Sequence, residues 1–308
     1  MPRGGRAARR GSVPGMTGVP PRSIVVGVDG SQTSDRAVDW AAEQARLEGR
    51  DLTLVHATGA VGAAALLWLD QAGVDSDLAM DGARRCAEQL LAAAAERVAQ
   101  VAPDVEVRGV VADLDARDAL LELAEDAALV VVGSRGRGPV RSLLLGSVAH
   151  ALSRQPVCPV VVLRPLAESV VRRGIVVGVD ASGTSTAALD FAYRLASLRQ
   201  QPLRVVHVIW DAAQSSGEVG PDEEGYDAER RVLAETLAGM GERYPDVAAV
   251  PVLTRGLVDR VLVRLAEDAG LVVVGVHRRG ALAGLVRGRT AAIVTEQSSG
   301  TVAVVPEP

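Results

Sequence analysis

The residues of this sequence that are best suited to chemistry form a glycine- and arginine-rich stretch after a run of valines. Three glycines and a serine follow the spacing G-x2-G-x9-G-S, with arginines between them. Glycine lets a backbone approach a ligand closely, and the N–H groups at a helix start attract anions. We therefore predict a phosphate site in this glycine loop, formed by Gly133, Ser134, Arg135, Gly136, Arg137, Gly146, Ser147 and Val148.

Two familiar phosphate-binding motifs are excluded here. The P-loop needs a lysine before its serine or threonine, and the chain has no lysine. The dinucleotide fingerprint needs G-x-G-x-x-G, an order that Gly133, Gly136 and Gly138 do not follow. The structural alternative is a glycine-rich surface loop with solvated arginines.

A carboxylate follows another apolar run of the sequence. Asp29 comes directly after Gly27 and Val28, and Ala57 ends the next apolar run. An aspartate there can accept hydrogen bonds from ribose hydroxyls or from an adenine amino group. The alternative is that Asp29 caps its own turn or the following helix.

These candidate residues fall at the ends of predicted strands. Valine-rich runs alternate with helical patterns over residues 34–47, 81–101 and 116–127 and from Ser147 onward. Such alternation is typical of a parallel sheet covered on both faces, where ligands lie beyond the carboxyl ends of the strands. The predicted strands are Ile24–Val28, Asp51–Ala57, Val105–Val111, Leu129–Gly133 and Pro159–Leu163.

The sequence contains an internal repeat. Ser23–Ser31 matches Gly174–Ser182, the same spacing separates His56 from His207, and the segment before the glycine loop recurs as Leu265–Gly275. We therefore predict two tandem α/β domains, each a doubly wound, Rossmann-like α/β/α sandwich with a five-stranded, parallel-type sheet. The expected organisation is a disordered leader at 1–22, domains at 23–165 and 174–308, and a linker at 166–173.

The loop spacing, the V-D-G-S turn and the repeat together resemble the universal stress protein family, over nearly the whole chain. The resemblance implies an adenine nucleotide alpha hydrolase-like fold that binds ATP, with Mg²⁺ on the phosphates. It also implies that Asp29 contacts the nucleotide, that Val28 lines the pocket, and that Ala57 meets adenine through its backbone.

The same resemblance implies a nucleotide-dependent regulator in stress response, with an unknown protein partner, rather than an enzyme. The last strand of each domain, Pro159–Leu163 and Thr301–Val305, is expected to pair subunits or the tandem halves, which gives a homodimer or an intramolecular pseudo-dimer. Two alternatives stay open: a nucleotide-free interaction scaffold, and an ATP-using hydrolase or nucleotidyl transferase on the same fold.

The second copy of the glycine loop departs from the pattern. Arg278 replaces the second glycine and Arg289 replaces the serine, which adds bulk where the backbone should approach a ligand. We expect this copy to bind ATP weakly or not at all. The alternative is that its arginines clamp phosphates directly. Its candidate residues are Gly178, Asp180, Val208, Gly275 and Gly288.

Charge, cysteine content and the N-terminal segment indicate which partners and which cellular location to expect. The 308-residue chain has a formal net charge of −5, which does not favour nucleic acid as a partner. Cys86 and Cys158 lack metal-ligand spacing and are expected to be buried thiols in a reducing compartment. The arginine-rich leader lacks the apolar stretch of a signal peptide, and Met16 is an alternative start. We expect a cytoplasmic protein that does not associate with membranes.

Histidine offers no catalytic pattern in this sequence. His56 and His207 recur at equivalent positions, but no serine or cysteine nucleophile accompanies them at a matching spacing. A histidine within an apolar strand is more often a hydrogen-bonded core residue. The four histidines are scattered along the chain, so we predict neither a catalytic residue nor a metal site.

Overall fold

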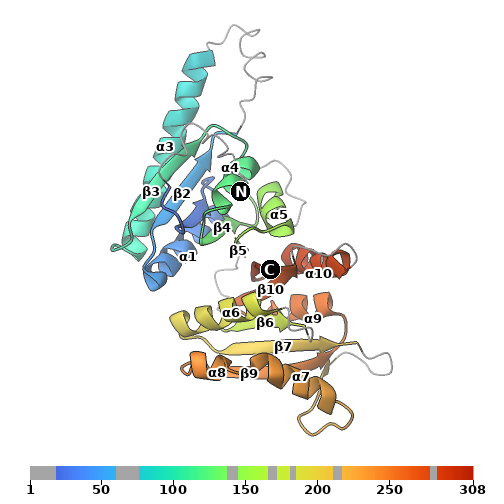
Figure 1. The fold of residues 1–308 in the computed structure, drawn as a ribbon. Helices are drawn as coiled ribbons and strands as arrows, with labels where there is room; N and C mark the ends of the chain where they lie inside the picture. Colours follow the sequence, from blue (N-terminus) through green and yellow to red (C-terminus); the bar gives the residue numbers. More distant parts are fainter. Residues whose placement is uncertain are drawn as a thin grey trace, which may run out of the picture.

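The computed structural model describes residues 19–59, 76–136, 145–165, 172–180, 185–210, 217–277 and 283–307. The described strands form one continuous sheet, in the order β3-β2-β1-β4-β5-β11-β10-β6-β7-β9-β8. Its two ends belong to the two copies of the repeat, which lie one above the other in Figure 1. The copies meet at the last strand of each.

The N-terminal half alternates strands and helices. Its strands pair in parallel in the order β3-β2-β1-β4-β5. Its elements are β1 (Ile24–Gly27), α1 (Gln32–Glu48), β2 (Leu52–Ala57), α3 (Ser76–Val101), β3 (Val107–Ala112), α4 (Ala116–Ala124), β4 (Leu129–Gly133), α5 (Ser147–Arg154) and β5 (Val160–Leu163).

The C-terminal half repeats this arrangement and adds a short antiparallel strand, β8, beyond β9. Its elements are β6 (Ile175–Val179), α6 (Thr186–Arg199), β7 (Leu203–Ile209), β8 (Gly217–Glu218), α7 (Asp227–Leu237), α8 (Met240–Arg243), β9 (Ala249–Arg255), α9 (Val258–Leu265), β10 (Leu271–His277), α10 (Ala283–Gln297) and β11 (Thr301–Glu307).

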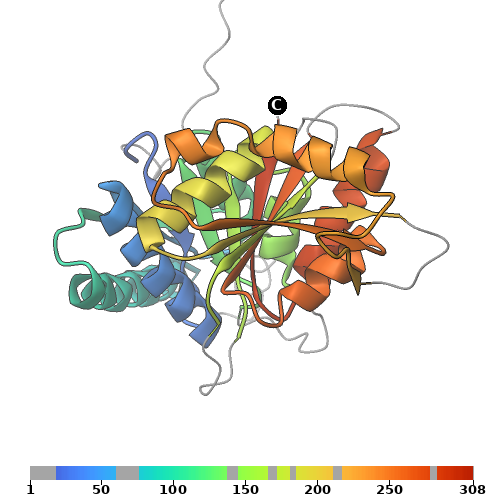
Figure 2. The same cartoon turned by 90° about the horizontal axis from the view of Figure 1, so that it is seen from below.

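Helices cover both faces of the sheet (Figure 2). Alternate residues of each strand therefore enter different cores: Val131 of β4 packs with α1 and α3, whereas Val130 and Val132 pack with α4 and α5. Because both faces of the sheet are buried, the strand sequences consist of consecutive apolar residues, mostly valine. The prediction of an α/β fold with two sandwich-type domains is confirmed.

The two halves join through β5 and β11, which pair antiparallel with Ala303 opposite Val161. Arg164 follows β5, is 4% exposed, and donates to the carbonyl oxygens of Thr295 and Glu296 (2.7 Å to Glu296) at the end of α10. Each strand that would otherwise end a five-stranded sheet thus has a partner, which removes two exposed edges.

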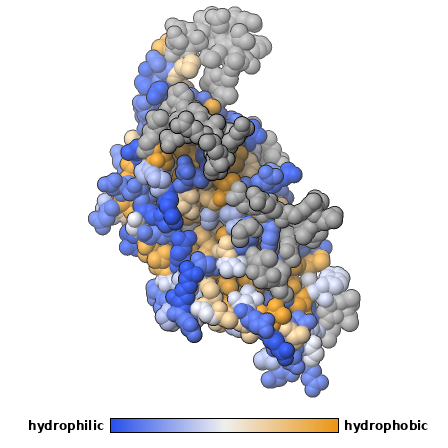
Figure 3. All heavy atoms as spheres, viewed as in Figure 1, coloured by the Kyte–Doolittle hydropathy of each residue, from blue (hydrophilic) through white to orange (hydrophobic). Residues whose placement is uncertain are grey.

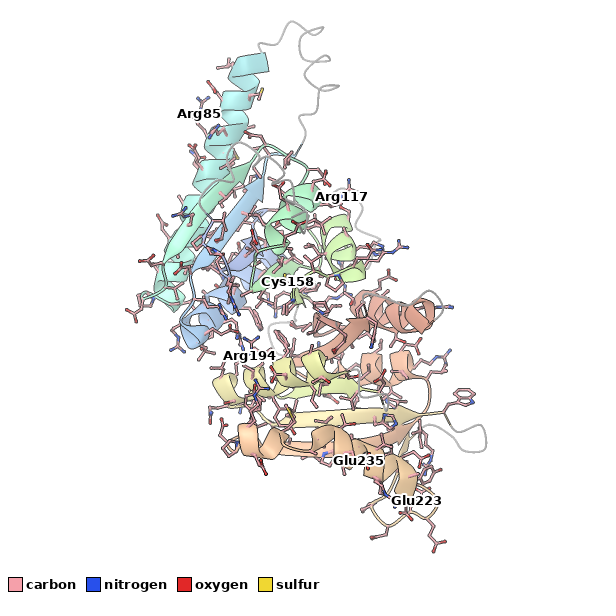
Figure 4. All side chains as sticks on the ribbon, viewed as in Figure 1. Arg85, Arg117, Cys158, Arg194, Glu223 and Glu235 are labelled. Atoms are coloured by element: carbon pink, nitrogen blue, oxygen red, sulfur yellow. The ribbon has the colours of Figure 1, made fainter. Side chains whose placement is uncertain are left out.

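Side chains of α1 and α6 add a second contact between the halves. The Arg199 guanidinium stacks on Trp40 at 4.3 Å from the ring centroid and donates to Gln44 Oε1 at 2.9 Å. Arg194, labelled in Figure 4 at this junction, pairs with Glu48 at 3.3 Å. Burial lowers the pKa of Arg199 to about 10, so this side chain still carries its charge at neutral pH.

Several expectations need correction. The C-terminal half has a sixth strand, because β8 pairs with the end of β9. Helix α3 begins at Ser76, earlier than the helix predicted from residue 81. Cys86 is exposed on the solvent face of α3, whereas Cys158 is buried (Figure 4) and burial raises its thiol pKa to about 12.

Other expectations lie outside the described residues or stay predictions. Residues 1–18 of the expected leader and 166–171 of the expected linker are not described. The domain boundaries stay predictions. Among the described residues, no helix combines the length and apolar character needed to cross a membrane. On the face in Figure 3, hydrophobic residues are interspersed with hydrophilic ones in both halves.

Candidate nucleotide site

A cavity of about 260 Å³ lies at the carboxyl edge of the N-terminal sheet. It opens where β1 and β4 end side by side, which is where a parallel sheet with helices on both faces places its ligand. Ten of the predicted site residues line it: Gly27, Val28, Asp29, Ala57, Gly133, Arg135, Gly136, Gly146, Ser147 and Val148. Strands, turn and helix start thus converge on one hollow.

The turn after β1 is fixed by its own hydrogen bonds. The Asp29 carboxylate accepts the Ser31 N–H at 3.0 Å, and the Asp29 N–H donates to Ser34 Oγ at 3.1 Å. Ser31, not Asp29, caps α1, by accepting the Ser34 N–H at 3.2 Å. Asp29 therefore shapes its own turn and also lines the cavity, and its contact with a nucleotide stays a prediction.

At Gly133 a side chain would displace the Thr33 backbone, whereas at Gly136 only the end of the Asp29 side chain would have to move. A Cβ on Gly133 would lie 2.8 Å from Thr33 Oγ1, and one on Gly136 would overlap the Asp29 carboxylate. Thr33 Oγ1 also donates to the carbonyl oxygen of Arg135. The start of the loop is thus packed directly onto the turn after β1. Arg135 itself is exposed at the cavity.

The N-terminus of α5 forms one end of the cavity. Gly146 is its N-cap residue and supplies no side chain to the first N–H groups of the helix. The Gly146 N–H donates to the Ser134 carbonyl at 2.7 Å, which anchors the helix start to the loop. Ser147 follows with an exposed side chain. Unpaired N–H groups and the helix dipole make this end of the cavity electropositive.

One predicted loop residue, Ser134, does not line the described cavity, and another lies outside the described residues. Ser134 is fully buried, and its hydroxyl has no hydrogen-bond partner among the described residues. Its backbone instead joins the loop to β5, because its N–H donates to the Leu163 carbonyl at 2.7 Å. Arg137 lies outside the described residues.

Much of the remaining lining of the cavity is apolar. Seven lining residues were not among the predicted ones: Ser34, Val55, His56, Ala116, Leu120, Val132 and Ala149. Ala116 and Leu120 are one helical turn apart on α4, a helix that the sequence indicated without showing which face it turns to the site. His56 Nδ1 donates to the Val28 carbonyl at 2.6 Å, which fixes its ring as a structural element.

The second copy keeps part of this geometry. Gly178 and Asp180 lie at the end of β6, Val208 near the end of β7, and Gly275 near the end of β10, all at the same edge of the sheet. Gly288, however, lies inside α10 rather than before it. Arg278 lies outside the described residues, and Arg289 is exposed on α10.

No group of three metal-ligating side chains occurs among the described residues. A divalent cation at this site would therefore depend on oxygens of a bound ligand as well as on protein oxygens such as the Ser147 hydroxyl. The described lining residues that ionise are Asp29, His56 and Arg135. They present no nucleophile activated by a neighbouring base.

The fold and the cavity define a tandem α/β protein with a ligand crevice at the carboxyl edge of its first half. The profile of the universal stress protein family matches residues 21–164 and 172–306. A universal stress protein of Mycobacterium tuberculosis is 35% identical over 302 residues, which cover 92% of this chain and 96% of the relative. One of Mycolicibacterium smegmatis is 34% identical with the same coverage.

A solved structure shares the fold of this chain. The crystal structure of a universal stress protein from Archaeoglobus fulgidus matches 92% of this chain and 96% of its own, with a TM-score of 0.67 at 18% identity. The chain belongs to the universal stress protein family and has two tandem domains of that family.

Proposed function

We propose that this chain binds ATP in its N-terminal crevice and acts as a nucleotide-dependent regulator in the cytoplasm. One observation carries the proposal: a single cavity has an apolar end of Val28, Ala57 and Leu120 and an electropositive end at the start of α5. An adenosine with phosphates has the same polarity, an apolar ring at one end and anionic oxygens at the other.

The residues of the cavity suit the parts of this ligand. Asp29 accepts hydrogen bonds from ribose hydroxyls, the backbone at Ala57 meets the adenine edge, and the volume of about 260 Å³ suits a nucleoside. The phosphates lie at the N–H groups of Ser147 and Val148, where Arg135 adds a mobile positive charge. Mg²⁺ rides on the phosphate oxygens.

A regulatory role is supported by the position of α5, whose start forms the proposed phosphate end of the cavity. Helix α5 starts at the cavity and lies beside α10 of the other half, where His150 and Glu296 approach to 3.3 Å. A ligand that orders the start of α5 therefore acts on an element that contacts both halves. The proposal also includes a protein partner, not identified here by its chemistry, that binds differently to the ATP-bound and ATP-free forms.

Two other functions predict different behaviour. A hydrolase or nucleotidyl transferase needs an acid–base or nucleophile set beside the phosphates. His56, the histidine in the cavity lining, already donates its Nδ1–H to the Val28 carbonyl. Slow hydrolysis by a positioned water is compatible with binding. A nucleotide-free scaffold predicts no ATP binding at all.

Isothermal titration calorimetry with ATP and Mg²⁺ tests the proposal on the full chain. We expect one ATP per chain, and Arg135→Ala should weaken binding at least about tenfold, because a charge-assisted hydrogen bond to phosphate is worth about 1.5–3 kcal/mol. Arg154→Ala is the matched control, an exposed arginine in the last turn of α5, and should bind like the wild type. Absence of binding by the wild type would favour the scaffold.

A further inference from the structure

A buried arginine lies between the proposed phosphate end of the first crevice and the second half of the chain. Arg164 is 4% exposed and donates through Nη2 to the carbonyl oxygens of Thr295 and Glu296. These carbonyls belong to the last turn of α10, where the helix dipole places negative charge. The arginine of the first half therefore stabilises the end of a helix in the second half.

Two backbone hydrogen bonds connect this arginine to the cavity. The Gly146 N–H, at the start of α5, donates to the Ser134 carbonyl at 2.7 Å, and the Ser134 N–H donates to the Leu163 carbonyl at 2.7 Å. Gly146 lines the cavity, and Arg164 directly follows Leu163. Ser134 is therefore the one residue between the cavity wall and the strand end that carries Arg164.

The last turn of α10 also meets the helix that begins at the cavity. Helices α5 and α10 lie beside each other (Figure 1), and His150 Nδ1 of α5 is 3.3 Å from Glu296 Oε1. Thr295 is fully buried, and its hydroxyl donates to the Ala291 carbonyl at 2.7 Å. This turn of α10 thus contacts both the end of β5 and the helix that starts at the phosphate end.

A second positive charge acts on Arg164 from the cavity. Arg135 lines the cavity and is exposed there. Burial, and then the charge of Arg135, lower the pKa of Arg164 to about 10, whereas the charge of Glu296 raises it. Repulsion between the two arginines disfavours the charged form of Arg164. Without an anion in the cavity, Arg135 therefore weakens the contact of Arg164 with α10.

A polyanion beside Arg135 reverses this effect. Phosphates at the start of α5 bring negative charge close to Arg135 and reduce its repulsion of Arg164. The charged guanidinium then holds the α10 carbonyls more strongly. By linkage, an Arg164 held on α10 also favours binding of the phosphates. The effect grows with the number of phosphates and is absent for an uncharged nucleoside.

We propose that Arg164 is the positioning residue through which phosphate charge in the first crevice tightens the last turn of α10 in the second half. Arg164 is not among the residues that line the described cavity, so it acts through charge and through the helix end. This inference rests on the proposed function and deepens it. The number of phosphates, rather than the base, sets the response of the second half.

Hydrogen–deuterium exchange of the full chain, followed by mass spectrometry, tests this response. The reporter is the peptide at the end of α10, where the Ser298 N–H donates to the Val294 carbonyl at 3.0 Å. With each ligand at saturation, we expect exchange there to slow about fivefold with ATP and Mg²⁺, less with AMP, and not with adenosine. The internal control is the end of α7, which packs on β9 and should not respond.

Two variants separate a response to charge from a purely structural contact. Arg164→Gln keeps a hydrogen-bond donor without the charge, so ATP should no longer slow exchange at the end of α10. Arg135→Ala removes the opposing charge, so exchange there should already be slower without nucleotide. Arg154→Ala, an exposed arginine in the last turn of α5, is the matched control and should behave like the wild type in both states.

Three results would overturn the inference: bound ATP that leaves exchange at the end of α10 unchanged, an undiminished ATP response in Arg164→Gln, or unchanged exchange in nucleotide-free Arg135→Ala. Equal slowing by adenosine and ATP would contradict a response to charge. Failure of the proposed function is distinguishable, because calorimetry would then show no ATP binding. Slower exchange in nucleotide-free Arg135→Ala, absent when Arg164→Gln is added, would still support the coupling between the cavity and α10.

Discussion

Gly133 and Gly136 show how one residue type serves both packing and binding. Their missing side chains leave room for Thr33 and the Asp29 carboxylate, so the start of the loop packs against the β1 turn. The bare backbone that results is also what a phosphate needs. Substitution by a large residue such as valine at Gly133 would therefore disturb folding and binding together.

An alanine at position 133 tests whether the close packing at Gly133 contributes to stability. Gly133→Ala should lower the free energy of unfolding by about 1–3 kcal/mol, because the new Cβ lies 2.9 Å from the Thr33 backbone. Urea denaturation followed by circular dichroism measures it. Gly109→Ala on β3 is the control, since its Cβ meets Leu91 at an ordinary 3.5 Å. Equal stabilities for the two variants would contradict the packing argument.

The sequence predicted the residues at the strand ends better than those on the helices. Asp29, Ala57 and Gly133 follow valine runs whose parallel pairing forces them to one edge. Leu120 and Ser34 were missed, because a helical pattern locates an apolar face without telling which residues of that face reach the site. Ser134 was included although its side chain turns into the interior.

At the scale of elements, the two glycine loops differ mainly in where the next helix starts. The sequence showed that Arg278 and Arg289 replace a glycine and a serine of the first loop. It did not show that α10 begins at Ala283, before Gly288, because no capping residue precedes Ala283 in the sequence. The strand boundaries shifted little; β4 spans Leu129–Gly133 as predicted, and β5 begins one residue later than predicted. Long buried valine runs specify strands strongly, whereas helix ends depend on tertiary contacts.

Arg164 is the element-scale contact that we expect to matter most for joining the halves. Arg164→Ala should lower the free energy of unfolding by about 1.5–3 kcal/mol, because the terminal carbonyls of α10 lose a charged donor. Burial lowers the pKa of Arg164 to about 10, so the donor is charged at neutral pH. Urea denaturation of this variant checks the value.

The control for Arg164 is an arginine on the surface of α3. Arg84 is 60% exposed and pairs with Glu88 at 3.6 Å, so Arg84→Ala should change stability by less than about 0.5 kcal/mol. A loss of stability in Arg164→Ala no larger than in this control would mean that the α10 contact does not stabilise the fold.

At the scale of the molecule, the chain places two copies of one domain about a shared sheet. The repeat indicated two domains, and the apolar last strands indicated exposed edges that need partners. The antiparallel pairing of β5 with β11 satisfies both strands within one chain. The sequence could not distinguish this from pairing between chains, because the same valines suit either partner.

Duplication also explains how the halves could diverge at their carboxyl edges. Each half keeps its own carboxyl edge, so changes at α10 and β11 leave the first cavity intact. In the proposed function, the contact of α5 with α10 through His150 and Glu296 would connect a nucleotide bound in the first half to the second half. The central claim is therefore that ATP occupies the crevice of the first half and not the second half.

Photolabelling with an azido derivative of ATP, in which the azide is on adenine, tests this claim most directly. After irradiation with Mg²⁺ and proteolysis, we expect the label in peptides that carry Ala57 or Ala116, and we expect excess ATP to abolish it. The C-terminal half should carry little label. Equal labelling of peptides that carry Val208 or Val258, or labelling that ATP does not compete, would contradict the account.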